Sequence, residues 1–419
     1  MKKKTYAVLM VIILITILVL LGSFLFYKYQ LDIKNKEEKQ LKLQDEKLIK
    51  EISNHYNEFV KVSKDTKLYV KINNKYKEIG TIYKDKSLIL NKVSINKYIK
   101  YFKIKDTDYY INYKDVEKID TYSIDQRYKN YIYFNTSIIT KKVTNLYQND
   151  KLVMTINKSF DLPIIIKDES GNYVEVNNEL YLIKNEDIKT TYEKENTNKE
   201  VAENIPVTVY HFLYLNGDNT CNEEICHSEN QIKDHFNYLK ENNFFTLNTH
   251  ELLLFIENKI NLPKSSVLVT IDDGARAVNF IPLLEEYKIN ATLFLIASWY
   301  DKNTLKSNYL ELGSHTTNLH TPGKCSGGQG SALKCENKNM LLSDLKTSRD
   351  YLYNTEAFCF PFYEFNDYAI SIVKEAGFKI AFIGGMKKVT RDIDPYKTPR
   401  ISLNRNTTLY EYKNIVNPS

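Results

Sequence analysis

The C-terminal half of the sequence predicts an α/β fold built on a parallel sheet or barrel. After Pro206, short apolar runs alternate with longer segments of helical periodicity. Strands are predicted over Val207–Tyr210, Val267–Ile271 and Ala291–Ala297, and helices over Ile232–Asn242 and Phe280–Tyr287. Alternation of this kind is typical of βα units whose strands run parallel.

Polar side chains at one strand end give this fold a candidate site. The apolar run 267–271 is followed directly by Asp272 and Asp273, and His315 and His320 come further along the chain. Ligand sites gather at the carboxyl edge of parallel strands. Two imidazoles and a carboxylate are suitable ligands for a divalent metal ion. Together these residues predict a hydrolytic metal site.

Amide hydrolysis at such a site needs three protein ligands, an open coordination position, a base and an acid. Because the backbone turns where a strand ends, Asp272 and Asp273 can both reach one pocket. One of them can bind the metal while the other takes a proton from water.

The N-terminal segment predicts a membrane anchor. Of the 419 residues, those from Tyr6 to Tyr27 are almost all apolar, and about 20 such residues span a bilayer. Lys2, Lys3 and Lys4 precede them, which favours a cytoplasmic N-terminus and an extracellular remainder. A cleaved signal peptide is the alternative. The long apolar run without a following Ala-x-Ala site favours an uncleaved single-pass anchor in the cell membrane.

Composition divides the rest of the chain. The Lys- and Glu-rich range 31–60 follows the anchor range 1–30 and predicts a helical stalk. Range 61–184 has short alternating runs between turn residues and predicts a small β-rich region, range 185–204 is a polar linker, and the α/β domain covers 205–419. In segments such as Gly-Thr-Ile-Tyr at 80–83 and Gly-Asn-Tyr-Val-Glu-Val at 171–176, the β-rich region resembles bacterial SH3-like wall modules. A stranded spacer and a glycan-binding module remain open alternatives.

Charge and cysteines narrow the class of protein. The net charge of +6 is spread over interleaved Lys and Glu and does not argue for nucleic acid as a partner. Export permits disulfides, and the candidate pairs are Cys221 with Cys226 and Cys325 with Cys335. Their spacing is wider than the C-x-x-C of structural zinc sites. Cys359, between two phenylalanines, is predicted to be a buried core thiol.

Residues 205–416 resemble the polysaccharide deacetylase family, which is carbohydrate esterase family 4. The resemblance rests on Thr-Ile-Asp-Asp-Gly at 270–274, Asn-Ala-Thr-Leu-Phe-Leu at 290–295 and His-Thr-Thr-Asn-Leu-His at 315–320. It implies a distorted (β/α) barrel for the domain.

The family's site residues map onto the same motifs. The resemblance implies Asp272 as the base and Asp273, His315 and His320 as ligands of one divalent metal ion. Zinc is the default metal for these ligands, and cobalt, nickel and iron also suit them.

Two differences from most members of the family point to one of its subgroups. His315 and His320 are five positions apart, which is similar to poly-N-acetylglucosamine deacetylases of biofilm systems. Because no histidine follows His320, the family's usual C-terminal acid is absent. In the subgroup a Tyr-His pair on the first strand supplies the acid, which implies His211. The alternative is that His211 is a satisfied core histidine.

The remaining histidines are assigned no chemistry. His55 belongs to the stalk, and His227, His235 and His250 are predicted to be loop or helix surface residues.

The third motif, at 358–363, lacks the family's usual arginine. The closing segment supplies Arg400, which is expected to lie against Asp272 and lower its pKa. Pro361 and Tyr363 are expected to line the substrate groove, where an aromatic face can stack on a sugar.

The resemblance implies an N-deacetylase that releases acetate from N-acetylglucosamine in a cell-surface polysaccharide. Poly-N-acetylglucosamine and peptidoglycan present the same acetamide, so the sequence leaves the polymer open. The alternative is an inactive wall-binding or scaffolding protein on the same fold, which the missing arginine motivates and the retained metal-site residues oppose. No His-Glu-x-x-His motif supports a metalloprotease.

Overall fold

The structure, a computed structural model, describes residues 2–194, 200–218 and 220–418, with side chains from residue 9. The chain separates into two compact units. The first contains residues 1–124 and 141–159, and the second contains residues 125–140 and 160–419.

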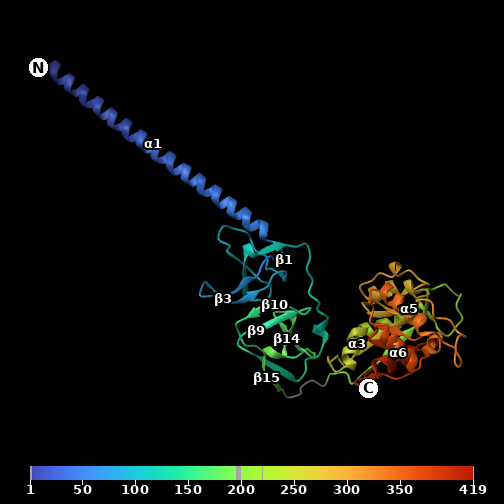
Figure 1. Cartoon of the computed structure of the whole chain (residues 1–419). Helices are drawn as coiled ribbons and strands as arrows, with labels where there is room; N and C mark the ends of the chain where they lie inside the picture. Colours follow the sequence, from blue (N-terminus) through green and yellow to red (C-terminus); the bar gives the residue numbers. More distant parts are fainter. Residues whose placement is uncertain (1, 195–199, 219, 419) are drawn as a thin grey trace. The chain divides into compact units, whose positions relative to one another are not determined.

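The first unit begins with helix α1 (Lys2–His55), which is one uninterrupted helix (Figure 1). The predicted membrane segment and the predicted stalk are therefore parts of the same element. From Leu9 the helix is long and apolar enough to cross a membrane, and the side chains of its apolar portion are exposed. A signal sequence would meet the same criterion.

Short antiparallel strands form the rest of the first unit. They are β1 (Phe59–Val62), β2 (Thr66–Ile72), β3 (Lys75–Ile82), β4 (Ser87–Ile89), β5 (Tyr101–Lys103), β6 (Tyr109–Asn112), β7 (Val116–Lys118), β9 (Thr144–Gln148) and β10 (Lys151–Ile156), with the 3-10 turn η1 (Tyr113–Asp115). Asn73 and Asn74 have positive φ and close the β2–β3 hairpin, as a two-residue turn requires.

The second unit contains strands that precede its barrel. They are β8 (Thr136–Thr140), β11 (Asp161–Pro163), β12 (Ile166–Lys167), β13 (Gly171–Val176), β14 (Glu179–Lys184), β15 (Ile188–Glu193) and β16 (Asn204–Ile205), with turns η2 (Arg127–Asn130) and η3 (Asn185–Asp187). The predicted linker 185–204 therefore begins as ordered structure, because β15 pairs with β8. Residues 195–199 of that linker lie outside the described residues.

Seven parallel strands of the described chain close into a barrel, in the order β17, β27, β25, β24, β23, β22 and β21, with β21 pairing back to β17. Their bounds are β17 (Val207–Tyr210), β21 (Ser266–Asp273), β22 (Ala291–Leu295), β23 (Leu310–Ser314), β24 (Ala357–Cys359), β25 (Ile380–Gly384) and β27 (Thr398–Ser402). Strand β20 (Phe245–Thr246) adds to β21, and β26 (Val389–Thr390) pairs with β16. The predicted α/β barrel is thus confirmed.

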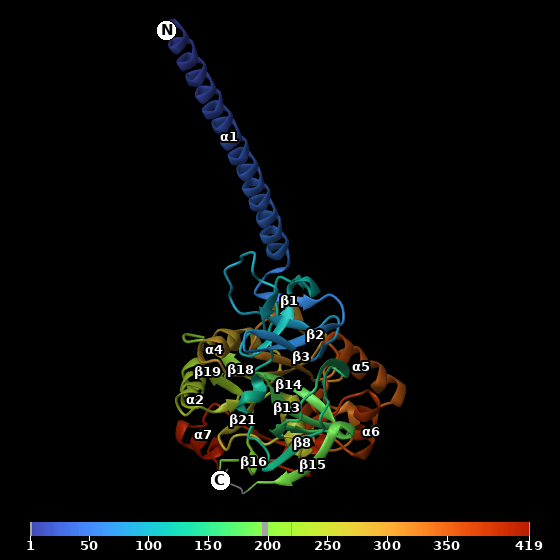
Figure 2. The ribbon, with the colours of Figure 1, turned by 90° about the vertical axis from the view of Figure 1, so that its left-hand side faces the viewer.

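Helices cover the barrel, and α2, α4 and α7 lie side by side, as do α5 and α6 (Figure 2). The helices are α2 (Glu229–Glu241), α3 (Thr249–Ile256), α4 (Phe280–Tyr287), α5 (Lys338–Tyr351), α6 (Asp367–Glu375) and α7 (Leu409–Val416). The 3-10 turns are η4 (Ala277–Asn279), η5 (Lys302–Thr304), η6 (Ala332–Lys334), η7 (Pro361–Tyr363) and η8 (Pro395–Lys397). Polar N-cap side chains begin most of the helices. For example, Asn248 and Glu251 form a capping box on α3.

The strand register brings the motifs to one edge. Asp273 is paired with Leu295 on β22, and Leu295 is paired with Ser314 on β23, directly before His315. Cys359 ends β24 on the same side. The carboxyl edge of the barrel therefore gathers side chains that are far apart in the sequence.

Candidate active site

Asp273, His315 and His320 form one cluster. An Oδ1 atom of Asp273 lies 3.4 Å from Nε2 of His315 and 3.3 Å from Nε2 of His320. The chain turns sharply here, with φ of +70° at Asp273 and +106° at Gly274. A Cβ atom at Gly274 would lie 2.4 Å from the Leu295 side chain, so glycine permits both the turn and the close approach.

The cluster fits a divalent metal ion. One ligand atom from each of the three residues lies within 4.8 Å of the others. Nδ1 of His315 lies 2.9 Å from the carbonyl oxygen of Cys359, so Nδ1 carries the proton and Nε2 is free to bind a metal. Burial lowers the pKa of His320 to about 4, which keeps its ring neutral. One carboxylate and two imidazoles, when they bind a metal ion, leave a coordination position open.

Asp272 is buried and is held by Arg400. Nη1 and Nη2 of Arg400 donate hydrogen bonds of 2.7 Å to Oδ1 and Oδ2 of Asp272. Burial alone would raise the pKa of Asp272, but the charge and hydrogen bonds of Arg400 outweigh it and lower the pKa. The carboxylate is therefore ionised and able to accept a proton.

Cys359 occupies the place of the missing third-motif arginine. It is a buried free thiol, as predicted. Its Sγ accepts a hydrogen bond of 2.8 Å from Nη2 of Arg400 and lies 3.6 Å from Oδ2 of Asp272. Arg400 thus reaches Asp272 from β27, beside the position where the family usually has its arginine.

His211 lies close to the two carboxylates. Burial lowers the pKa of His211, whereas the charges of Asp272 and Asp273 raise it. Its Nδ1 is buried and has no hydrogen-bond partner among the described residues. A satisfied core histidine would have one.

Pro361 and Tyr363 lie in the turn η7 that follows β24. Pro361 is buried, and the Tyr363 hydroxyl lies 3.1 Å from Oγ of Ser402. The Arg400 guanidinium lies 5.2 Å from the centre of the Tyr363 ring, while the Phe362 ring lies 4.5 Å from that of His320. Tyr363 therefore lies against Arg400, the partner of Asp272, and Phe362 is the ring of this turn that lies beside a predicted ligand.

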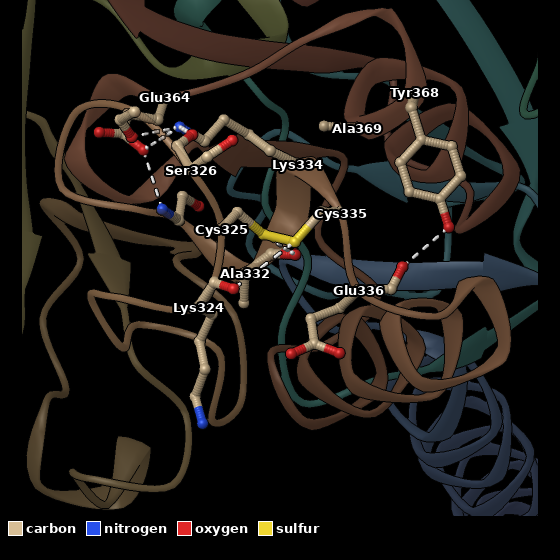
Figure 3. Close-up of a disulfide and its surroundings, with 12 residues drawn as sticks. Lys324, Cys325, Ser326, Ala332, Lys334, Cys335, Glu336, Glu364, Tyr368 and Ala369 are labelled. Carbon is tan, nitrogen blue, oxygen red and sulfur yellow. Dashed lines mark hydrogen bonds and ion pairs between the residues drawn. A yellow bond between two sulfur atoms is a disulfide. The ribbon is translucent and has the colours of Figure 1, made fainter.

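Both predicted cysteine pairs are joined, Cys221 with Cys226 and Cys325 with Cys335. Figure 3 shows the second disulfide in the loop that follows His320, with Lys334 directed toward Glu364. Glu364 also accepts hydrogen bonds from the backbone N–H groups of Gln329 and Ser331. These contacts tie the loop to the segment after Tyr363.

Sequence reasoning missed Trp299, the only tryptophan of the chain. It follows β22, its side chain is 52% exposed, and its ring centre lies 5.8 Å from that of His320. The signal available in the sequence was the position of Trp299 just after a predicted barrel strand, where site residues gather.

The prediction that His227 and His235 are surface residues was wrong. They are 1% and 0% exposed. The His235 ring stacks on Tyr412 at 3.9 Å, and its Nδ1 lies 3.0 Å from the Tyr210 hydroxyl. Aromatic neighbours from other elements cover these polar rings. His250 is largely exposed, as predicted.

Comparison with known proteins agrees with this description. Residues 259–381 match the family model described as polysaccharide deacetylase. Poly-beta-1,6-N-acetyl-D-glucosamine N-deacetylases of Staphylococcus epidermidis and Staphylococcus aureus are each 29% identical over 196 residues, which is 42% of this chain. The match spans 66% of the length of each relative.

The chain is also similar to solved deacetylase structures. A de-N-acetylase from Aggregatibacter actinomycetemcomitans is 24% identical, covers 50% of this chain and 99% of its own, and has a TM-score of 0.44. A Streptococcus pyogenes deacetylase in complex with acetate is 20% identical, covers 51% and 99%, and has a TM-score of 0.43. The matched sequence and the closed parallel barrel lead to one conclusion: the C-terminal barrel of this chain is a polysaccharide deacetylase domain.

Proposed function

We propose that this protein is a metal-dependent N-deacetylase of N-acetylglucosamine residues in a cell-surface polysaccharide. The observation that carries the proposal is the adjacency of two groups. Asp273, His315 and His320 form a three-ligand cluster, and Asp272, the residue directly before Asp273, is a buried carboxylate kept ionised by Arg400. A metal site with a neighbouring base is the arrangement that metal-dependent amide hydrolysis uses.

Each residue has a separate role in this mechanism. A divalent metal held by the three ligands would polarise the acetamide carbonyl and acidify a water molecule. An Oδ atom of Asp272 takes a proton from the water molecule while the oxygen of that water adds to the acetyl carbon. His211 then donates a proton to the amine nitrogen as the carbon–nitrogen bond breaks. The products are acetate and a free amino sugar.

Zinc is the metal that we propose for the cluster, because it accepts a carboxylate and two imidazoles in tetrahedral geometry. Cobalt, nickel and iron can bind the same donors. Loading the chelator-treated protein with each metal in turn would identify the best one. The expected result is loss of acetate release with the chelator and recovery with zinc.

As substrate we propose a poly-β-1,6-N-acetylglucosamine polymer. The staphylococcal relatives are named for activity on that polymer, and the five-position spacing of His315 and His320 favours the same subgroup. The exposed ring of Trp299 beside His320 offers a face on which a sugar can stack. Peptidoglycan, whose acetamide is identical, serves as the comparison polymer.

The alternative of an inactive wall-binding protein rested on the missing third-motif arginine. Arg400 makes a bidentate contact with the base from another strand, so the absence of that arginine no longer favours inactivity.

We further propose that α1 remains an uncleaved anchor, with its N-terminus in the cytoplasm and the barrel outside the cell. The expected result is a full-length chain in membranes, with the barrel open to added protease in intact cells. A mature chain that lacks α1 would contradict the anchor.

The test of the activity is acetate release by the full-length protein in detergent, loaded with zinc, from both polymers in parallel. Asp273→Ala is expected to abolish release and reduce bound metal. Asp367→Ala removes a carboxylate whose side chain is 99% exposed and is expected to change neither. Bound metal with no acetate from either polymer would contradict the function and favour a binding protein.

A further inference from the structure

We propose that His227 is the positioning residue of His211: through one water molecule, its Nε2 accepts the hydrogen bond of the Nδ1–H of His211. This inference rests on the proposed function, in which His211 is the acid. Neither the family match nor the motifs assign any role to His227.

The chain places His227 beside the first barrel strand. Strand β19 (Cys226–Ser228) pairs in parallel with β18 (Phe212–Tyr214), which begins directly after His211, and His227 is in register with Leu213. The disulfide of the preceding residue, Cys226, ties β19 to the loop before it. His227 is 1% exposed, and its ring contacts that of Tyr210 edge-on at 5.1 Å.

Gln231 determines which nitrogen of His227 carries the proton. Nε2 of Gln231 donates two hydrogen bonds of 2.9 Å, to the carbonyl oxygens of Asn404 and Thr407. Both amide protons of Gln231 are therefore used. If the amide were rotated by 180°, its oxygen would face the two carbonyl oxygens, which cannot donate a hydrogen bond. Oε1 of Gln231 lies 3.1 Å from Nδ1 of His227 and can only accept. Nδ1 of His227 is thus the protonated nitrogen, and Nε2 has a free lone pair.

One buried nitrogen atom is then a hydrogen-bond donor without an acceptor, and another is an acceptor without a donor. Among the described residues, neither Nε2 of His227 nor Nδ1 of His211 has a hydrogen-bond partner. An acid that gives its Nε2 proton to the leaving amine keeps Nδ1–H throughout the cycle. Nδ1–H of His211 therefore needs an acceptor, and Nε2 of His227 is an acceptor without a donor. Pairing the two nitrogens through one water molecule satisfies both.

The electrostatics support this pairing. Burial and, to a smaller extent, the charge of His211 lower the pKa of His227 to about 4, although the Gln231 hydrogen bond partly offsets them. His227 therefore stays neutral and keeps its acceptor lone pair when His211 is charged. A neutral acceptor on Nδ1–H fixes the ring of His211 and stabilises its protonated form.

The neighbouring His235 provides a matched control. It is equally buried and also contacts Tyr210, but its Nδ1 already has the Tyr210 hydroxyl as a partner, and its ring stacks on Tyr412. A substitution there perturbs the same aromatic cluster without removing the proposed acceptor.

The kinetic test compares three variants of the full-length, zinc-loaded protein. His227→Phe keeps an aromatic ring but no acceptor, and is expected to lower kcat about 10- to 100-fold with little change in KM, the usual scale for groups that orient a catalytic residue. His227→Gln, which restores an acceptor oxygen, is expected to recover part of the loss. His235→Phe is expected to keep kcat within about threefold. Equal kcat losses in His227→Phe and His235→Phe would overturn the proposal.

A second measurement does not depend on turnover. Nitrogen-15 NMR of histidine-labelled protein is expected to show His227 protonated at Nδ1 only and His211 protonated at Nδ1. A His227 ring protonated at Nε2 would overturn the proposal. If the wild type releases no acetate, the proposed function fails, while the NMR spectrum still decides whether Nε2 of His227 is the free acceptor that the proposal needs.

Discussion

Arg400 and Asp272 form a fully buried bidentate ion pair, although 128 positions separate them in the chain. The two hydrogen bonds of 2.7 Å bind one carboxylate oxygen each, so they fix the orientation of the Asp272 side chain. Because Arg400 is 0% exposed, neither charge is screened by solvent. The pair therefore orients the base and keeps it ionised.

Removing Arg400 is expected to leave a buried, unpaired carboxylate. Arg400→Met should destabilise the protein by about 3–5 kcal/mol, the usual cost of such a group. It should also lower kcat at least about 100-fold while the metal content is unchanged, because the three ligands remain. Thermal unfolding, acetate release and metal analysis measure the three effects.

A double variant tests the coupling. Asp272→Asn combined with Arg400→Met has no unpaired buried charge, so its stability should lie closer to wild type than the sum of the single effects. Simple additivity of the two losses would contradict the buried pair.

Trp299 is expected to contribute to polymer binding. Trp299→Ala removes an aromatic face beside His320 and should raise KM about three- to tenfold with kcat almost unchanged, as expected for about 0.5–1.5 kcal/mol of ring stacking. Trp299→Phe should recover part of the loss. Tyr353→Ala removes another exposed aromatic ring, in a cavity that reaches Leu310 at the start of β23, and should leave KM unchanged. If Trp299→Ala and wild type had equal KM, Trp299 would not contribute to polymer binding.

The barrel is expected to depend on residues before position 205. Within the second unit, Nε of Arg127 donates a hydrogen bond of 2.8 Å to Oε1 of Glu251, whose side chain is 2% exposed, and the Tyr131 hydroxyl donates one of 3.0 Å. Arg127→Met should therefore cost about 3–5 kcal/mol of stability. A fragment that begins at residue 205 should unfold at a lower temperature than the full chain, because it lacks Arg127 and Tyr131, which both donate hydrogen bonds to Glu251.

A matched control separates burial from charge. Lys67→Met breaks the exposed ion pair with Glu78 in the first unit and should change stability by less than about 1 kcal/mol. Equal effects of the Arg127 and Lys67 substitutions would contradict the role given to the buried pair.

Glu364 should give the loop after His320 a measurable pH dependence. Hydrogen bonds from Lys334 and from the Ser331 N–H lower the pKa of Glu364 to about 2, below its unfolded value of about 4.3. A depressed pKa contributes stability above the unfolded value and loses it as the pH falls toward 2. The difference in unfolding temperature between wild type and Glu364→Gln should therefore be largest above pH 5 and shrink below it. Glu375→Gln, on an exposed ion pair, should show little difference at any pH. A difference for Glu364→Gln that is independent of pH would contradict the assignment.

Much of the barrel could be predicted from local pattern. The expected strand at 207–210 is β17 itself, the expected helix at 280–287 is α4, and β21 extends the expected strand 267–271 only to Ser266–Asp273. These segments combine β-branched or helix-forming residues with the right period, so local propensity and burial agree. The polar composition of range 185–204 predicts a linker, but β15 forms there by pairing with β8. Composition does not show such a pairing.

The same limit applies to the histidines. A polar residue in a helix or loop is usually exposed, so the sequence predicts His227 and His235 at the surface. Their burial depends on Tyr210, Tyr412 and Gln231, which come from three other positions in the chain. No periodicity in the sequence carries that information.

The sequence by itself determined the apolar N-terminal helix, the α/β class of the barrel, and the residue types of a metal site at a strand end, because these depend on neighbours within a few positions. Only the tertiary structure decided that Asp273, His315 and His320 converge, that Arg400 holds Asp272, and that His227 has an unpaired lone pair. Those relationships arise when barrel closure brings distant strand ends to one edge and buries polar groups, each of which then needs a partner.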